Sequence, residues 1–141
     1  MSTIPQELLL AYQDTNYIVY AAQGFILRVS EYSAAFAELA ETQKYRQAVF
    51  ITAHNPHSNI QTPQQNRDVQ DLLRAQVLKN RWNYFEGVGQ SRDGSWRENS
   101  LLIFGPSRLE AQGLGKKYNQ LAVVWVDESA VPEILLCCKS D

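Results

Sequence analysis

Cysteine, histidine and long apolar segments are all scarce in this sequence of 141 residues. The two cysteines, Cys137 and Cys138, are adjacent and would point to opposite faces of a strand, so a mutual disulfide is not expected. Thiols that stay reduced are typical of a cytoplasmic protein. No apolar run approaches the roughly 18–20 residues of a membrane-spanning helix. The N-terminus also lacks the basic start of a signal peptide, so no membrane or secretory role is expected.

Motifs that identify common enzyme classes are missing as well. The sequence contains no Gly-rich cradle with a Walker lysine, no Ser-x-Gly elbow and no carboxylate pair at a fixed spacing. The net charge is −2, which gives no overall basic surface for nucleic acid. The sequence therefore names neither a reaction nor a cofactor, and it leaves open whether the protein is an enzyme.

Apolar periodicity and turn signals predict the element order α-β-β-α-β-α-β-β-α-β-β. Thr62 and Gln65 match a capping box, with Pro63 at the first helical position. We expect one α/β (α+β) domain over residues 1–141, with a mixed sheet, hairpins and about four packed helices. Helices are expected at about 5–12, 33–45, 62–79 and 107–118, and strands at 17–20, 25–29, 48–52, 82–91, 95–104, 121–126 and 133–138.

A polar loop between a buried strand and a helix start indicates where a ligand would bind. The apolar strand 48–51 runs into the loop 52–59, and a helix begins after Thr62. Open α/β sheets place ligands at such junctions. Thr52 and Asn55 of the loop are candidate ligand-binding residues. Asn66, in the first helical turn, leans back toward the loop and would either touch the ligand or brace the loop.

The predicted hairpin places two glycines opposite two polar residues. If Asp93-Gly94 forms the two-residue turn, Gly89 faces Glu98 and Gly87 faces Ser100. A glycine in a strand often marks a close approach by another group. The missing side chains would therefore leave a hollow beside Glu98.

Glu98 is the candidate acid or base of that hollow, which Trp96 and Phe85 would enclose. A partly desolvated carboxyl has a raised pKa and can act as a general acid or base or anchor a cation. Gln120, at the head of an apolar strand, needs polar partners, and this hollow is one option. Alternatively, the glycines allow a bulge and Glu98 is a solvent-side residue or pairs with an arginine.

Other residues of the loop suggest weaker hypotheses. His54 and His57 have a spacing that can bind zinc or iron, but no third ligand is marked, so no metal site is predicted. Both are more simply exposed loop residues. Thr52, Ser58 and the free N–H groups after Thr62 form a further candidate site for a phosphate or carboxylate, but the Gly-rich cradle and the Walker lysine are missing.

Several motifs in order resemble an uncharacterised bacterial family, the domain of unknown function numbered 3293. Its pattern is Thr-Ala-x-Asn-Pro, a downstream Asn, a Glu-x-Ser in the hairpin, and a Gln-x-Ala after the last long helix. The similarity runs from about Tyr17 to Cys137. It implies a small, single-domain bacterial protein and no particular activity. The residues that the resemblance selects are Thr52, Asn55, Asn66, Glu98, Ser100 and Gln120.

These observations lead to a principal hypothesis and two alternatives. In the first, the loop 52–56 and the hairpin 82–104 form a pocket for a small polar ligand, such as a nucleotide or metabolite. Glu98 would be catalytic, and the positioning residues would be Thr52, Asn55, Asn66, Ser100 and Gln120.

The alternatives use other surfaces of the chain. In a non-enzymatic interaction or regulatory module, exposed aromatics such as Tyr12, Tyr32 and Trp82 would bind a partner, and the polar cluster would be structural. Binding of nucleic acid is the least favoured, because of the acidic balance. It would use Lys44, Arg46, Arg74, Lys79 and Arg81.

Overall fold

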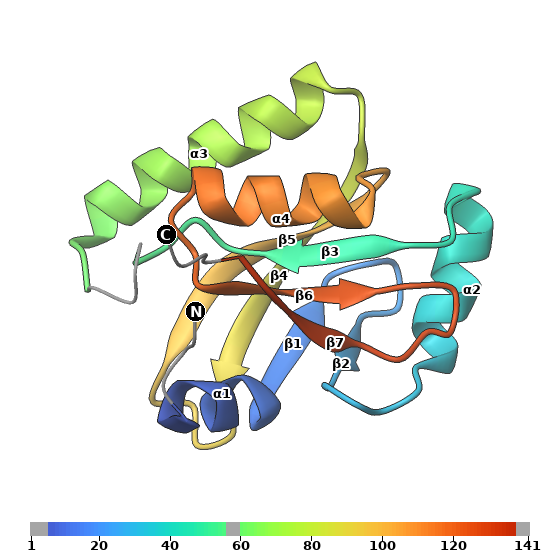
Figure 1. Ribbon diagram of the computed structural model, residues 1–141, viewed down its shortest axis with the longest axis horizontal. Helices are drawn as coiled ribbons and strands as arrows, with labels where there is room; N and C mark the ends of the chain where they lie inside the picture. The colour runs from blue at the N-terminus through green and yellow to red at the C-terminus, as the bar shows by residue number, and fades with distance from the viewer. Residues whose placement is uncertain (1–5, 56–59, 138–141) are drawn as a thin grey trace.

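The computed structural model describes residues 6–55 and 60–137 and has the predicted order of elements (Figure 1). The helices are α1 (Gln6–Gln13), α2 (Ala34–Gln43), α3 (Pro63–Lys79) and α4 (Arg108–Lys117). The strands are β1 (Thr15–Val19), β2 (Phe25–Leu27), β3 (Ala48–Ile51), β4 (Asn83–Ser91), β5 (Arg97–Phe104), β6 (Ala122–Val126) and β7 (Glu133–Leu136). In these ranges no helix combines the length and the apolar character needed to cross a bilayer.

The strands form one seven-stranded sheet in the order β2-β1-β4-β5-β3-β6-β7. The α+β class is confirmed, but the mixed sheet is wrong, because every neighbouring pair is antiparallel. Helix α3 joins β3 to β4, which run in the same direction but have β5 between them. Helix α4 joins β5 to β6 in the same way, with β3 between them. The crossovers therefore create no adjacent parallel strands.

The central segment from β3 to β6 has the split βαββαβ arrangement of ferredoxin-like domains, with the strand order β4-β5-β3-β6. The hairpin of β1 and β2 extends this unit at one side, and β7 extends it at the other. Helices α3 and α4 lie together over one face of the sheet (Figure 1). Helices α1 and α2 lie away from them, near opposite ends of β3 (Figure 1).

Two hydrophobic cores lie on opposite faces of the sheet. Beneath α3 and α4, Leu73 and Leu114 pack in a buried cluster with Val49 of β3. On the other face, Phe36 of α2 stacks on Phe104 of β5, with 5.7 Å between ring centroids. All four residues of β3 and all five of β6 are buried, which explains why these strands are continuously apolar. The side of the second face away from α2 holds a pocket.

Local signals in the sequence fixed the helix starts and the hairpin. Thr62 and Gln65 form the complete capping box at α3, and Ser107 forms another with Glu110 at α4. The pairing of β4 with β5 confirms the predicted register, with Gly87 opposite Ser100 and Gly89 opposite Glu98. No bulge interrupts the eight paired positions, so the geometry expected at Glu98 is retained.

Candidate functional site

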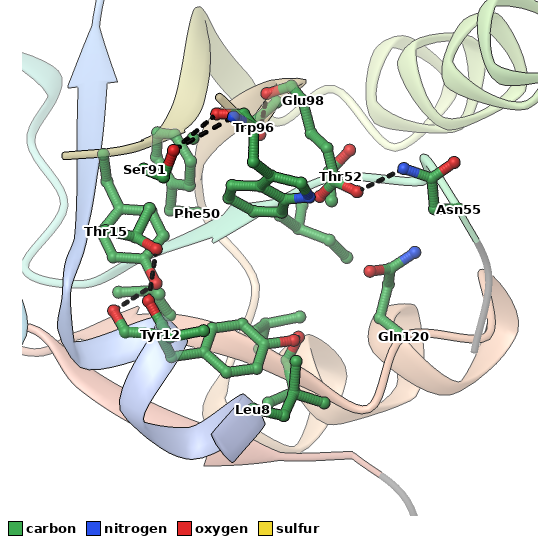
Figure 2. A pocket seen from close by; sticks show the side chains of 18 of the residues that line it. Leu8, Tyr12, Thr15, Phe50, Thr52, Asn55, Ser91, Trp96, Glu98 and Gln120 are labelled. Carbon is green, nitrogen blue, oxygen red and sulfur yellow. Dashed lines mark hydrogen bonds between the residues drawn. The ribbon is translucent and has the colours of Figure 1, made fainter. Parts of the chain in front are cut away.

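A pocket of about 360 Å³ lies where β3 ends and β5 and β6 begin, on the face opposite α3 and α4. Figure 2 shows α1 running across it, so that side chains of the helix face the sheet. Its apolar lining includes Leu8, Ala11, Tyr12, Tyr17, Phe50, Ile51, Ile60, Trp96, Ala122, Val123 and Val124. Its polar side chains include Thr52, Asn55, Glu98, Ser100 and Gln120. The pocket is thus largely apolar, with a cluster of polar groups.

Glu98 is the buried carboxyl group of this cluster, with 8% of the residue exposed. Burial raises its pKa to about 7, since desolvation disfavours the charged form. A hydrogen bond of 2.7 Å from Asn55 Nδ2 to Glu98 Oε2 acts in the opposite direction and lowers the pKa. Within the described residues, Oε1 accepts no hydrogen bond. Glu98 can therefore both release and accept a proton near neutral pH.

The side chain of Asn55 is oriented by two backbone N–H groups. Asn66 Oδ1 accepts a hydrogen bond from the backbone N of Asn55 at 2.9 Å, which places Asn66 Nδ2 against Asn55 Oδ1 at 3.1 Å. The backbone N of Gln61 also donates to Asn55 Oδ1, at 3.0 Å. A backbone N–H can only donate, so both amide orientations follow. Asn55 must present Nδ2 to Glu98.

The backbone of Asn55 also suits its residue type. Its φ of 48° lies in the left-handed region, which asparagine tolerates better than most residues. The dipeptide Asn55-Pro56 is typical of a turn, although Pro56 lies outside the described residues. The amide and its unusual backbone angle together bring a loop residue to strand β5.

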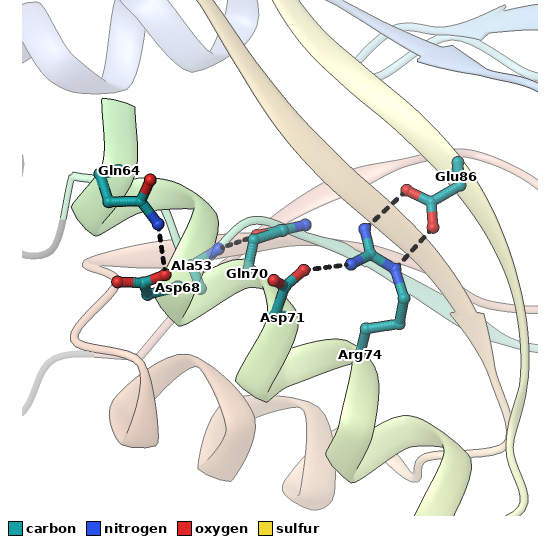
Figure 3. A network of polar contacts seen from close by, with 7 residues as sticks. All are labelled: Ala53, Gln64, Asp68, Gln70, Asp71, Arg74 and Glu86. Atoms are coloured by element: carbon teal, nitrogen blue, oxygen red, sulfur yellow. Dashed lines mark hydrogen bonds and ion pairs between the residues drawn. The ribbon is translucent and has the colours of Figure 1, made fainter. Parts of the chain in front are cut away.

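Two further side chains hold the loop after β3. Thr52 Oγ1 donates to the carbonyl oxygen of Asn99 at 2.6 Å and accepts from the backbone N of His54 at 3.0 Å. Gln70 of α3, 2% exposed, accepts a hydrogen bond from the backbone N of Ala53 at 2.9 Å (Figure 3). The loop is therefore anchored to both β5 and α3 before it reaches Asn55.

Gln120 and Ser100 complete the polar cluster. Gln120 Nε2 donates to the carbonyl oxygens of His54, at 3.0 Å, and Tyr118, at 3.3 Å. Figure 2 shows the Gln120 amide extending toward the Glu98 side of the pocket, with its oxygen turned inward. Ser100 is 2% exposed, and its hydroxyl donates to the backbone oxygen of Glu98 at 3.1 Å. Its hydroxyl oxygen keeps acceptor capacity, and Ser100 lines the pocket.

The structure brings the six candidate residues together from three separated segments, but not all six reach the pocket. Five of them line the pocket, namely Thr52, Asn55, Glu98, Ser100 and Gln120. Asn66 is not among the lining residues and contacts Asn55 instead. Its position fits the bracing role that the sequence left open as an alternative to ligand contact.

The expected hollow is present at one glycine and filled at the other. Gly89 and Trp96 line the pocket. At Gly87, the ring of Phe50 occupies the space, because an added Cβ would lie 2.9 Å from Phe50 Cε2. Phe85 does not enclose the pocket and packs edge-on against Phe104, with 6.2 Å between centroids. The prediction that Phe85 walls the hollow is therefore wrong, because the side chain serves the neighbouring core.

Sequence reasoning missed the wall that α1 provides and the anchor at Gln70. Leu8, Ala11 and Tyr12 recur at helical spacing, a signal that this helix covers something. Gln70 falls on the same buried stripe as Leu73 and Val77. A glutamine on a buried stripe indicates a specific hydrogen-bond partner, here the loop after β3.

The histidine hypothesis gains no support. His54 does not line the pocket, and burial lowers the pKa of its side chain. Within residues 6–55 and 60–137, no group of three or more His, Cys, Asp or Glu side chains has a geometry that would hold a metal ion. His57 and Ser58 lie outside the described residues.

Some of the residues that the interaction and nucleic-acid hypotheses would use make contacts within the fold. Tyr12 lines the pocket, and Trp82 is half-buried against the first core, whereas Tyr32 is 65% exposed. Among the basic residues, Arg74 holds Glu86 through two hydrogen bonds of 2.8 and 3.0 Å (Figure 3).

The model of a family described as "Protein of unknown function (DUF3293)" matches residues 51–123. The chain belongs to this family. The DUF3293 match contains all six candidate residues and ends within β6, whereas α1 lies outside it. No curated protein and no solved structure matches the chain. Membership of DUF3293 therefore implies no particular activity, and the pocket is the main indication of function.

Proposed function

We propose that the pocket binds a small ligand and that Glu98 acts on it as a general acid or base. The observation that carries this proposal is a buried carboxyl group with one oxygen open toward a pocket of about 360 Å³. A pKa of about 7 suits proton transfer at neutral pH in both directions. Clefts of this size that combine apolar walls with a few convergent polar groups are typical ligand sites.

The other polar residues have positioning roles in this proposal. Asn55 fixes the Glu98 carboxyl through the hydrogen bond to Oε2. Thr52, Ser100 and Gln120 lie beside it with acceptor groups that can orient a polar part of the ligand. Asn66 holds Asn55 in place rather than touching the ligand. The ligand would therefore join a polar group to a larger apolar part, whereas the sequence predicted a small polar ligand.

A thermal-shift screen of the wild type and Glu98→Gln tests the proposal, using nucleotides, amines, carboxylic acids and divalent metals. We expect at least one compound to raise the melting temperature of the wild type by several degrees and to have little effect on the variant. Equal stabilisation of both proteins would show that Glu98 does not contribute to ligand binding.

Absence of any stabilising compound would favour the interaction module, in which the polar cluster only braces the fold. In that case a partner capture that is unaffected by Glu98→Gln would locate the functional surface elsewhere. The bacterial origin and cytoplasmic location remain predictions from the sequence.

A further inference from the structure

The pocket has a carboxyl group, that of Glu98, with no basic partner among the described residues. None of the described residues that line it is lysine, arginine or histidine. The other lining carboxylate, Asp14, pairs with Arg92 at 2.5 Å, and both side chains are more than half exposed. Glu98 is buried and receives a single hydrogen bond within the described residues, from the neutral amide of Asn55. Buried charges are normally paired, so a positively charged ligand would supply the missing partner.

A second acceptor lies on the same side of the pocket. Gln120 uses Nε2 to hold the carbonyl oxygens of His54 and Tyr118, and this fixes the amide so that Oε1 is left for another group. Within the described residues, Oε1 accepts no hydrogen bond. Figure 2 shows the Gln120 side chain directed toward Glu98. Glu98 Oε1 and Gln120 Oε1 are thus two acceptor atoms that receive no hydrogen bond within the described residues. Such a pair suits an ammonium group, which has three N–H donors and no acceptor.

The remaining lining suits an apolar body attached to that ammonium group. The rings of Tyr12, Phe50 and Trp96 face the pocket, together with Leu8 of α1 (Figure 2). Aromatic rings attract a nearby cation through the negative charge on their faces and also bury apolar surface. An anionic ligand would meet Glu98 with no basic side chain among the described lining residues to offset the repulsion.

We infer that the ligand is an amine in its ammonium form on an aromatic or branched apolar body, with the nitrogen between Glu98 and Gln120. This inference rests on the proposed function, because it names the chemical class of ligand for the same pocket. It differs from a site for a neutral molecule, which would hydrogen-bond the protonated Glu98 carboxyl. It also differs from a site for a nucleotide, whose phosphates need basic side chains or N–H groups.

Isothermal titration calorimetry at pH 8 tests the inference with three probes of similar shape and different charge. The probes are 2-phenylethylamine, the neutral 2-phenylethanol and the anionic 3-phenylpropionate. Aliphatic amines are protonated at this pH, and the Glu98 carboxyl, with a pKa of about 7, is mostly ionised. We expect the amine to bind at least about tenfold more tightly than either of the other probes, the amount that one charge-assisted hydrogen bond supplies.

Two glutamine variants identify the group responsible. Glu98→Gln should weaken binding of the amine by about tenfold or more, the loss expected from one charged hydrogen bond. Glu86→Gln is the matched control, since Glu86 lies on the partner strand β4, is exposed and contacts Arg74 rather than the pocket. It should bind the amine as the wild type does. Equal weakening in both variants would overturn the assignment to Glu98.

Gly89→Ala provides a test that leaves every charge in place. An added Cβ at Gly89 would make ordinary contacts of 3.8–3.9 Å with Tyr17, Thr15 and Trp96, so the variant should fold. The new methyl group would occupy part of the pocket, and binding of 2-phenylethylamine should weaken severalfold. Unchanged binding would place the amine outside this pocket.

The possible outcomes separate the inference from the proposal on which it rests. Preferred binding of 2-phenylethanol or 3-phenylpropionate, lost in Glu98→Gln, would overturn the amine assignment and retain the ligand pocket. Failure of all three probes would also overturn the inference, and the wider thermal-shift screen would then decide the fate of the pocket itself.

Discussion

The side chains of Asn55 and Glu98, 43 positions apart in the sequence, meet in a hydrogen bond of 2.7 Å. This contact joins the loop after β3 to strand β5 at the polar cluster of the pocket. Asn55 can act only as the donor, because its oxygen already accepts from Gln61 and Asn66. The bond therefore favours the ionised form of Glu98 and partly offsets the effect of burial on its pKa.

Asn55→Asp should raise the pKa of Glu98 above the value of about 7 in the wild type. The substitution removes the donor and places a second carboxylate beside the first. It should also lower the free energy of unfolding by about 1–3 kcal/mol, the usual cost of breaking a buried hydrogen bond. NMR titration of the Glu98 carboxyl carbon and denaturant unfolding measure the two effects.

Asn119→Asp is a suitable control for that substitution. Asn119 has a φ of 58°, so the same change is made at another left-handed position, and the residue is exposed outside the pocket. It should leave the titration of Glu98 unchanged. A Glu98 pKa that does not rise in Asn55→Asp would mean that the hydrogen bond has little influence on the carboxyl group.

Glu98→Gln should stabilise the protein at pH 8 and have little effect near pH 4. The folded-state pKa of Glu98, about 7, exceeds its ordinary value of 4.5, so the folded protein binds this proton more tightly. Its stabilising contribution is complete below about pH 4.5 and is lost as the pH rises to about 7. Above that pH, ionisation of Glu98 has lowered the free energy of unfolding of the wild type by about 3 kcal/mol. Glutamine does not ionise, so the variant does not lose this stability.

Urea unfolding of both proteins between pH 4 and 8 measures this effect. Within the described residues, the other titratable side chains that line the pocket are Tyr12 of α1, Tyr17 of β1 and Asp14, which pairs with Arg92; His54 lies on the adjoining loop. All are retained in Glu98→Gln, so the difference between the two pH profiles isolates Glu98. The control is Glu41→Gln on the exposed side of α2, which should show no such difference. Destabilisation by Glu98→Gln at pH 8 would instead mark the carboxylate as a structural anchor.

Gly87→Ala should be far more destabilising than Gly89→Ala, although the two glycines are neighbours on one face of β4. A Cβ at Gly87 would lie 2.5 Å from the carbonyl oxygen of Ile18 and 2.9 Å from the ring of Phe50. Overpacking of this kind costs about 1–3 kcal/mol. At Gly89 the nearest atom is 3.8 Å away, so thermal unfolding should show little change. Equal melting temperatures for the two variants would contradict this difference in packing.

Gln70→Leu should loosen the loop after β3 while keeping α3 folded. Leucine cannot accept the hydrogen bond from the backbone N of Ala53, a bond of 2.9 Å in the wild type. We expect the Ala53 amide to exchange with deuterium about tenfold faster, which corresponds to losing one hydrogen bond. Gln64→Leu, on the exposed side of the same helix, removes surface contacts with Asp68 and Arg67 and should not alter this rate.

Much of the fold follows from signals that act over a few residues. The capping box at Thr62 marked the start of α3, because its hydrogen bonds close within one helical turn, and the structure has a second box at Ser107 at the start of α4. The Asp-Gly signal placed the hairpin correctly, although the turn itself closes around Arg92-Asp93, with the backbone N of Gly94 donating to the carbonyl oxygen of Ser91 at 3.0 Å. The register of β4 and β5 was still predicted correctly, because this loop also places Ser91 opposite Trp96. That register alone placed Gly89 opposite Glu98. The polar residues of the site also stood out against apolar strands in the sequence.

The arrangement of those pieces required contacts between distant segments. Only the folded chain shows that β5 lies between β3 and β4, which makes the sheet antiparallel despite its crossovers. Packing decides that Phe50 fills the space at Gly87 while the space at Gly89 stays open. It also decides that α1 forms one wall of the pocket and that no basic side chain lines the described part of the pocket. The sequence determined which side chains are available, whereas burial and pairing, which depend on every neighbouring element, determined the pKa of Glu98 and the chemistry of its site.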